Sequence, residues 1–367
     1  MTLKPLSILH TESSLGWGGQ EIRILSESQG LIRRGHQVKL ICAPESRILS
    51  EAAAWKVPVF ALPIAKKRLI GLKCMLEWLK LDKCHVVSTH SSTDSWLTAV
   101  ALLALGKPCA MVRTRHISAP VPRNFMTRWL YTKATARIVT TGEALKGELV
   151  RRNGYSESRI ESVPTGVDST RFAPGDRAAA RQKLGLPADA PLIGIVATLR
   201  SWKGHRYLVE AFAGLPEKAM LVIVGDGPQR EALEKLVRKL KLEARVRFAG
   251  NQRDVLPWLQ ALDIFALPSY ANEGVPQALV QAMLVGLPCV TTHAGSIAEL
   301  AIDGQTALVA KPQDVRSLQE NLSILLKDQD LRTRLGNAAR QHCAEGFSYE
   351  KMLDRMEAVY RRVSGRY

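Results

Sequence analysis

Residues 263–286 read Asp263-Ile-Phe-Ala-Leu-Pro268-Ser-Tyr-Ala-Asn-Glu273-Gly-Val-Pro276-Gln-Ala-Leu-Val-Gln281-Ala-Met-Leu-Val-Gly286. A short apolar run ends at a proline, a polar loop follows, and Pro276 opens an apolar segment that closes at Gly286, so the pattern predicts a strand, a loop and a helix. Glu273 is expected at the mouth of the helix, and Gln281 about 12 Å further along it, since each helical residue adds about 1.5 Å. Two polar side chains at that spacing can hold two parts of one elongated polar ligand.

The same alternation of strand and helical segment runs through both halves of the chain. The strands expected in the first half are 6–10, 38–42, 57–60, 86–89, 111–113, 138–140 and 160–163. Those expected in the second half are 192–196, 220–224, 246–248, 264–267, 289–292 and 308–309. A turn-rich break at 164–175 separates the two series. We therefore expect two α/β domains with parallel sheets, and ligands at the carboxyl ends of the strands and in a cleft between the domains.

The composition fits a protein without a membrane span. The chain has 367 residues, 46% of them hydrophobic, which suits two well-packed domains. No window approaches the roughly 20 uninterrupted apolar residues that a spanning helix needs, and the amino terminus lacks a signal-peptide pattern, so a cytoplasmic location is expected. The six cysteines form no C-x-x-C pair, and most lie in apolar runs, which favours buried, reduced thiols over disulfides or a zinc site.

The net charge is +17, and most of the excess lies in the first half: 25 basic against 13 acidic residues (+12) in 1–175, and 26 against 21 (+5) in 176–367. Such a field attracts a phosphorylated substrate, an anionic membrane surface or nucleic acid, although an ordinary solvated basic surface explains it equally well. The basic, apolar segment 66–79 fits a membrane-surface helix, while a core-facing helix with a charged outer side is the favoured alternative. Aromatic residues are only 6% of the chain, which disfavours nucleic-acid binding.

Polar loops in the first half follow two of its expected strands. Gly18 and Gly19, after the first strand, allow a ligand to approach the backbone closely, and a plain flexible turn explains the pair as well. Arg113-Thr-Arg115-His116 follows another strand directly, which predicts two arginines and a histidine at the carboxyl edge of the sheet. A histidine there can approach a sugar or a phosphate, although a structural role is the commoner one.

Three loops of the second half also follow strand ends. In Thr198-Leu-Arg200-Ser-Trp-Lys203-Gly204, two cations three residues apart can clamp a pyrophosphate. Gly225-Asp226-Gly227-Pro228 is a turn that leads into a charged helix, and the loop at Glu273 is the third. Each alone fits a turn or a helix cap, but their occurrence at successive strand ends favours one ligand site.

Two common nucleotide motifs are missing. The sequence has no G-x-x-x-x-G-K-[ST] loop and no G-x-G-x-x-G after the first strand, which disfavours NTP hydrolysis and dinucleotide redox chemistry. The D-x-D triplet, Asp328-Gln-Asp330, fits a helix start better than a metal site. The charge of a diphosphate would then be balanced by Arg200, Lys203 and helix N-termini, which predicts a site without metal or cofactor.

As an ordered set, five motifs resemble the signature of family 4 glycosyltransferases. They are Leu199-Arg-Ser-Trp-Lys203-Gly204, Gly225-Asp-Gly-Pro228, Ala261-Leu-Asp263-Ile-Phe-Ala-Leu-Pro268-Ser269, Glu273-Gly-Val-Pro276, and Ile297-Ala-Glu299-Leu with Asp303-Gly304. Members are retaining, nucleotide-sugar-dependent enzymes with the GT-B fold, in which two Rossmann-like domains face a cleft. The resemblance covers nearly the whole chain. It implies an acceptor-binding domain at 1–170, a donor-binding domain at 171–347 and, at 348–367, a helix that crosses back to the first domain.

The resemblance also implies roles for single residues. Arg200 and Lys203 would hold the donor pyrophosphate, and Gln281 would sit at the ribose. His116 and Glu273 are the implied catalytic residues. His116 would lie beside the attacking acceptor hydroxyl, and Glu273 would bind hydroxyls of the donor sugar. The remaining residues implied on the donor side are Gly225, Asp226, Gly227, Gly274 and Val275. Those implied on the acceptor and phosphate side are Gly18, Gly19, Gln20 and Arg115. The leaving phosphate of such enzymes is thought to take the proton, so no enzymic nucleophile is expected.

Two positions depart from the family pattern. Gln281 stands where members commonly have a second glutamate, and Thr198 where many have an arginine. The sequence thus predicts a hexosyltransferase that uses a nucleotide sugar, preferably a UDP-sugar, and a lipid-linked or phosphorylated acceptor such as lipopolysaccharide core. It also predicts peripheral contact with the inner membrane face and no nucleic-acid partner. Two alternatives remain open: a nucleotide-sugar epimerase on the same fold, and a non-catalytic basic protein that binds anionic lipid or nucleic acid through 60–80.

Overall fold

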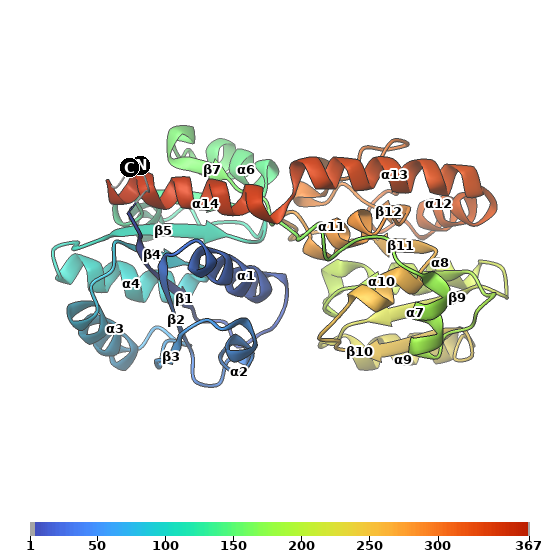
Figure 1. Cartoon of the computed structure of the whole chain (residues 1–367), viewed down its shortest axis with the longest axis horizontal. Coiled ribbons are helices and arrows are strands. Elements are labelled where there is room, and N and C mark those ends of the chain that lie inside the picture. The colour runs from blue at the N-terminus through green and yellow to red at the C-terminus, as the bar shows by residue number, and fades with distance from the viewer. Residues whose placement is uncertain (1–3, 366–367) are drawn as a thin grey trace. The chain divides into compact units, whose positions relative to one another are not determined.

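A computed structural model describes residues 4–365 and divides the chain into two compact units (Figure 1). One unit runs to Pro164 and includes the chain from Glu350 onward, and the other is Thr165–Tyr349. Each contains one sheet in which all neighbouring strands are parallel. The two Rossmann-like domains expected from the sequence are therefore confirmed. No helix among the described residues combines the length and apolar character needed to cross a membrane.

The sheet of the first unit has the order β3-β2-β1-β4-β5-β6-β7. Its strands are β1 Ser7–Glu12, β2 Gln37–Cys42, β3 Val59–Ala61, β4 Val86–Thr89, β5 Ala110–Arg115, β6 Arg137–Thr140 and β7 Ile160–Ser162. The order reverses between β1 and β4, the point where ligands bind in open α/β sheets, beyond the carboxyl ends of the strands. Polar residues after these two strands are therefore the first place to look for a site.

Helices cover both faces of this sheet. They are α1 Gly19–Arg33, α2 Arg47–Glu51, η1 Ala52–Trp55, α3 Leu69–Leu81, α4 Ser92–Ala104, α5 Phe125–Trp129, η2 Leu130–Ala134, α6 Glu143–Asn153, η3 Glu157–Arg159 and α14 Tyr349–Ser364. One apolar cluster joins α3 and α4 to Leu9 and Ile41, and another joins α1 to Leu40 and Cys42. Because successive strand residues point to opposite faces, these two clusters lie on the two sides of the sheet.

The sheet of the second unit has the order β10-β9-β8-β11-β12-β13, with its reversal between β8 and β11. Its strands are β8 Leu192–Val196, β9 Met220–Val224, β10 Val246–Gly250, β11 Ile264–Leu267, β12 Cys289–Thr291 and β13 Leu308–Val309. Its helices are α7 Arg177–Leu184, η4 Ser201–Lys203, α8 His205–Ala213, α9 Arg230–Lys239, α10 Leu256–Ala261, α11 Gln277–Leu284, η5 Gly295–Glu299, α12 Val315–Lys327 and α13 Gln329–Gly346. As expected, Asp328 begins a helix, because its side chain accepts a hydrogen bond from the Leu331 amide of α13.

Every predicted strand is present among the described residues, and the bounds that differ do so by one or two residues. Five strands have the expected bounds (86–89, 192–196, 220–224, 264–267 and 308–309). The first strand was expected to stop at His10, but it continues through Thr11 and Glu12, both fully buried. Polar residues continue this strand because hydrogen bonds from neighbouring side chains satisfy the Glu12 carboxylate.

Two other expectations are only partly met. Within segment 66–79, α3 begins at Leu69 and buries Met75 and Leu79 against α4, but it leaves Leu69 and Ile70 exposed at its start. Half of the cysteines are buried, as expected, while the other half are partly exposed: Cys74, Cys84 and Cys109. Sulfur atoms of the last two lie 3.5 Å apart.

Candidate active site

In the second unit, the structure brings together two of the predicted site residues. Lys203 ends η4, after β8, and Glu273 lies in the loop between β11 and α11. The Lys203 ammonium donates to the Glu273 carboxylate, with Nζ and Oε1 2.6 Å apart. The Glu273 side chain is only 5% exposed and that of Lys203 is 19% exposed. This pair therefore places one cation and one carboxylate at the β8–β11 switch point, where a polar ligand is expected.

Glycines allow the backbone to approach this pair from two directions. Gly204 has a φ of +77°, and a Cβ there would lie 2.0 Å from the Pro268 carbonyl oxygen, at the end of β11. Gly295 has a φ of +58°, and a Cβ there would lie 2.0 Å from the carbonyl oxygen of Glu273. Only glycine fits such contacts. The loop that carries Glu273 is thus packed against backbone on both sides, which fixes the carboxylate.

The other residues predicted on the donor side lie in the same unit. Gly274, Val275 and Gln281 are buried beside Glu273 or along α11. The turn at Asp226 packs on the loop after β8, since the amide of Leu199 donates to its carbonyl oxygen at 3.0 Å and Gly225 and Gly227 leave no room for a Cβ. Arg200 is exposed, and its guanidinium lies 5.7 Å from the centre of the Trp202 ring. Lys203, not Arg200, is thus the cation that faces Glu273.

In the first unit, His116 lies at one end of a row of three histidines. Nε2 of His116 is 3.0 Å from Nδ1 of His90, and Nε2 of His90 is 2.9 Å from Nδ1 of His10. His10 lies in β1, His90 directly after β4 and His116 directly after β5, and these are three adjacent strands of the sheet. Burial lowers the pKa of all three imidazoles, and it lowers those of His90 and His116 well below the usual value. The row is therefore neutral at pH 7.

Beyond His10, the row ends at a buried acid on α1. The carboxylate of Glu27 lies 4.0 Å from Nε2 of His10 and accepts a 2.6 Å hydrogen bond from the hydroxyl of Tyr360, on α14. The guanidinium of Arg23 lies 3.8 Å from the same carboxylate. All of these side chains are at most 1% exposed. The carboxyl-terminal helix therefore contributes a hydrogen bond to the polar network at the buried end of the histidine row.

A second polar network contains Gln20, which was expected on the acceptor side. Its side-chain amide donates to Glu12, at 2.5 Å, and to Ser91, at 3.0 Å, and Ser91 in turn donates to Glu12. Asp94 accepts from the amides of His90 and Ser91 and so caps α4. Burial, with the Asp94 charge next, raises the pKa of Glu12 to about 8, and burial raises that of Asp94 to about 6.

The remaining residues expected on the acceptor side have clear local roles. Gly18 precedes α1 and accepts the Ile22 amide, and Gly19 is the first residue of that helix. The guanidinium of Arg115 donates to the carbonyl oxygens of Ile117 and Ala119, the latter at 2.6 Å, so it holds the loop that follows His116.

The first unit has a large cavity at the carboxyl edge of its sheet, of about 710 Å³. Its wall combines basic side chains with apolar and aromatic ones. The basic ones are Lys67, Arg68, Arg113 and Arg115, and the others include Leu69, Trp96, Met126 and Tyr131. Two of the cations lie over aromatic rings, Lys67 on Trp96 at 5.3 Å and Arg113 on Tyr131 at 4.7 Å. A cavity of this kind suits a ligand with an anionic group and an apolar part.

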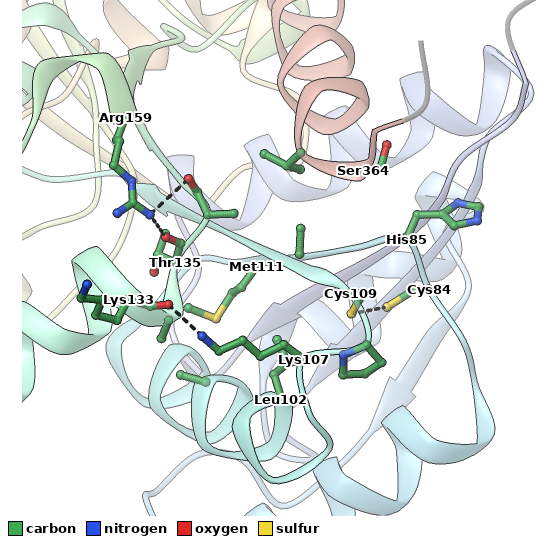
Figure 2. A pocket seen from close by; sticks show the side chains of 16 residues that line it. Cys84, His85, Leu102, Lys107, Cys109, Met111, Lys133, Thr135, Arg159 and Ser364 are labelled. Atoms are coloured by element: carbon green, nitrogen blue, oxygen red, sulfur yellow. Dashed lines mark hydrogen bonds between the residues drawn. The ribbon is translucent and has the colours of Figure 1, made fainter.

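Another cavity, of about 560 Å³, lies at the opposite, amino edge of the same sheet (Figure 2). Its wall contains Lys107, Lys133 and Arg159, together with the close thiols of Cys84 and Cys109. Figure 2 shows the two sulfur atoms facing each other, and Lys107 reaching the carbonyl oxygen of Lys133. Since ligands of this fold class bind beyond the carboxyl ends of the strands, we do not assign this cavity to the candidate active site.

Sequence reasoning missed the inner part of the site: His10, His90, Glu27, Glu12 and Asp94. A signal for two of them was present, because His10 ends the first predicted strand and His90, like His116, follows an apolar strand. Nothing in the sequence states that these three strands are neighbours, and only the strand order brings the rings together.

Two protein-family models match the chain, one in each half. A model described as Glycosyltransferase Family 4 matches residues 17–171, and one described as Glycosyl transferases group 1 matches residues 176–342. Among relatives, a D-inositol 3-phosphate glycosyltransferase from Nocardia farcinica is 32% identical over 284 residues, which cover 74% of this chain. The same alignment covers 60% of that relative, less than two thirds of its length.

Solved structures resemble nearly the whole chain. HepE from Anabaena, crystallised with UDP-glucose, matches with a TM-score of 0.88 at 19% identity, over 97% of this chain and 100% of that one. WaaG, described as a glycosyltransferase involved in lipopolysaccharide biosynthesis, matches with a TM-score of 0.75 at 18% identity, over 98% of this chain and 100% of that one. At these identities the likeness concerns the fold alone.

Proposed function

This chain belongs to the family 4 and group 1 glycosyltransferases, and from that premise we propose that it transfers a hexose-type sugar from a UDP-sugar to a lipid-linked or phosphorylated glycan. It has the GT-B fold of two Rossmann-like domains, and as a group 1 member it transfers a sugar from a nucleotide sugar. UDP as the nucleotide is supported by the Anabaena structure, which contains UDP-glucose. The choice of sugar and acceptor is part of the proposal.

The observation that carries the donor side is the buried pair of Lys203 and Glu273. In our proposal Lys203 binds the pyrophosphate, and Glu273 accepts hydrogen bonds from hydroxyls of the donor sugar, with the backbone of Gly274 and Val275 beside it. Gln281, on α11, contacts the ribose through its amide. The negative charge that develops on the leaving phosphate is balanced by Lys203 and by backbone N–H groups, so the reaction needs no metal ion.

Retention of the anomeric configuration is the second part of the mechanism that we propose. The acceptor hydroxyl attacks the anomeric carbon from the face that the phosphate leaves, the carbon–oxygen bond to the phosphate breaks, and a phosphate oxygen takes the hydroxyl proton. His116 contacts the acceptor hydroxyl as it attacks. No residue of the protein has to form a covalent intermediate.

The acceptor side rests on the basic, partly apolar cavity next to β5. Its four cations suit a phosphate group, and Leu69, Trp96 and Met126 suit an attached lipid chain. Leu69, Phe125 and Met126 are 85%, 84% and 64% exposed, which supports a peripheral contact of this edge with an anionic membrane. A lipopolysaccharide-core acceptor is supported by the fold shared with WaaG, and a soluble inositol phosphate by the Nocardia relative.

An assay of the full chain with UDP-, GDP- and ADP-sugars tests the donor, and a panel of acceptors tests the rest. Turnover with a UDP-sugar and a phosphorylated lipid-linked glycan, unaffected by a chelator and giving the retained anomer by NMR, is expected. Turnover with inositol phosphate alone would replace the lipid-linked acceptor in the proposal. Absence of binding and turnover with every nucleotide sugar would refute it.

The same assay separates the two alternatives. An epimerase would convert the donor sugar without any acceptor, whereas a non-catalytic lipid-binding protein would bind UDP weakly or not at all by calorimetry. Glu273→Ala is expected to lower turnover at least about tenfold while the protein stays folded. Near-wild-type activity of that variant would remove Glu273 from the site.

A further inference from the structure

We propose that Glu27 sets the positions of the protons in the row of three histidines, and that it thereby leaves Nδ1 of His116 as a hydrogen-bond acceptor. Glu27, His10 and His90 are then positioning residues that act on the candidate site from within the first unit. The proton positions follow from the geometry of this unit alone, and their consequence for catalysis rests on the proposed function.

A row of neutral imidazoles has only two consistent proton arrangements. Each neutral ring carries one N–H and one bare nitrogen, so in each contact of the row one ring donates and the other accepts. Because His116 faces His90 with Nε2, and His90 faces His10 with Nε2, the protons are either on all three Nε2 atoms or on all three Nδ1 atoms. The first arrangement points every N–H toward Glu27, and the second points every N–H away from it.

The buried end of the row decides between these arrangements. Nε2 of His10 lies 4.0 Å from the Glu27 carboxylate and has no hydrogen-bond partner among the described residues. An N–H there is attracted to the carboxylate, whereas a lone pair would face another lone pair. Both ring and carboxylate are fully buried, so water does not screen this difference. The contacts of Glu27 with Arg23 and the Tyr360 hydroxyl suit an anion at this place.

The consequence appears at the opposite end, at His116. With Nε2–H donated to His90, the Nδ1 atom of His116 carries the lone pair, and no described residue donates a hydrogen bond to it. His116 is partly exposed, whereas His90 is only 5% exposed, so His116 is the member of the row that a ligand can reach. It can accept a hydrogen bond from a hydroxyl of the transferred sugar in one fixed orientation, while the proton of the attacking hydroxyl goes to the leaving phosphate. The reverse arrangement would present an N–H and repel the proton of that sugar hydroxyl.

NMR of the full chain labelled with ¹⁵N-histidine tests the proton positions directly. Two-bond and three-bond proton–nitrogen couplings distinguish Nε2–H from Nδ1–H in each ring, and single His→Gln variants assign the three signals among the eight histidines. At pH 7 we expect all three rings to be Nε2–H. An Nδ1–H or doubly protonated His116 in the wild-type protein would overturn the proposal, with or without any measured activity.

Two variants separate the effect of the carboxylate from that of packing. Glu27→Gln removes the charge and offers His10 an amide that can donate a hydrogen bond, so the row should become a mixture that includes Nδ1–H rings. The value of kcat should fall at least about tenfold, while the affinity for UDP stays unchanged. Tyr360→Phe is the matched control, because it deletes one hydrogen bond to Glu27 but keeps its charge, and the row should remain Nε2–H. Unchanged ring protons in Glu27→Gln, with a normal melting temperature, would show that the carboxylate does not set them. Shifted protons with unchanged turnover would instead refute the role proposed for His116.

Discussion

Replacement of Lys203 by methionine is expected to destabilise the second unit as well as weaken donor binding. The substitution leaves the Glu273 carboxylate, whose side chain is 5% exposed, without the ammonium that lies 2.6 Å away. Removal of one partner of a buried ion pair costs about 3–5 kcal/mol, and the lower end applies here because Lys203 keeps a fifth of its side-chain surface in water. For a unit of this size, about 3 kcal/mol corresponds to a melting temperature lower by roughly 6–12 °C.

A double variant turns this estimate into a sharper test. In Lys203→Met/Glu273→Gln neither charge of the pair is left, so the double variant should regain about 2 kcal/mol of the stability that the single one loses. Thermal melts of the full chain measure this, and calorimetry with UDP should show weakened binding in both variants. Arg206→Met is the control, since the Arg206–Glu210 pair has its arginine 72% exposed and should contribute little to stability.

Two results would refute a structural role for the ion pair: a Lys203→Met variant that melts at the same temperature as Arg206→Met, or a double variant that is less stable than Lys203→Met. Either result would mean that the carboxylate of Glu273 is adequately hydrated without its partner. A normal UDP affinity in a destabilised Lys203→Met protein would instead separate the structural role of the pair from donor binding.

Three further changes have expected outcomes. The raised pKa of Glu12 lets the folded state hold a proton that the unfolded state releases, so the stability of the wild-type protein should fall as the pH rises from about 4.5 through about 8. Glu12→Gln should flatten this dependence, and urea titrations at pH 5 and 8.5 measure the slope. Hydrogen peroxide should oxidise the Cys84 and Cys109 thiols to a disulfide, with release of two waters per peroxide. Mass spectrometry should then detect tryptic peptide 84–113 as resistant to alkylation and lighter by about 2 Da. Gly204→Ala should destabilise the second unit by about 1–3 kcal/mol in thermal melts and weaken UDP binding, because its Cβ would meet the Pro268 carbonyl oxygen.

Each of these has a control in the same chain. A Glu12→Gln variant with the wild-type slope between pH 5 and 8.5 would assign that slope to other groups. Cys74→Ser should not change the peroxide product, and full alkylation of the wild-type peptide after peroxide would contradict the close thiols. Gly250 also has a positive φ, +68°, but an added Cβ there would meet open space, so Gly250→Ala should lower stability less than Gly204→Ala. Equal costs would mean that the close approach of backbone at Gly204 contributes nothing.

The sequence alone was enough to predict the strands and the family of this protein. Apolar runs of four to five residues bounded by Gly, Pro and polar clusters are a local signal, and β8 and β11 were predicted with their observed bounds. Lys203 and Glu273 were recognised because each lies in a polar loop that follows such a strand. Their ion pair was not predicted, since 70 residues separate them and the order of the strands in the sheet brings them together.

Local patterns failed where burial is decided by distant residues. The first strand was ended at His10 because Thr11 and Glu12 are polar, yet both are buried and satisfied by Ser91, Gln20 and Asp94. An isolated polar side chain predicts exposure, and it is only the partners supplied by α1 and α4 that make burial favourable.

The sequence placed a histidine at or near the end of three strands, and that is all it determined about them. Tertiary structure decided that β1, β4 and β5 are adjacent, that the three rings share two hydrogen bonds, and that a glutamate on α1 and a tyrosine on α14 close the row from within. The physical reason is that hydrogen bonds between side chains act over about 3 Å, whereas the residues that form them here are separated by up to 333 positions in the chain.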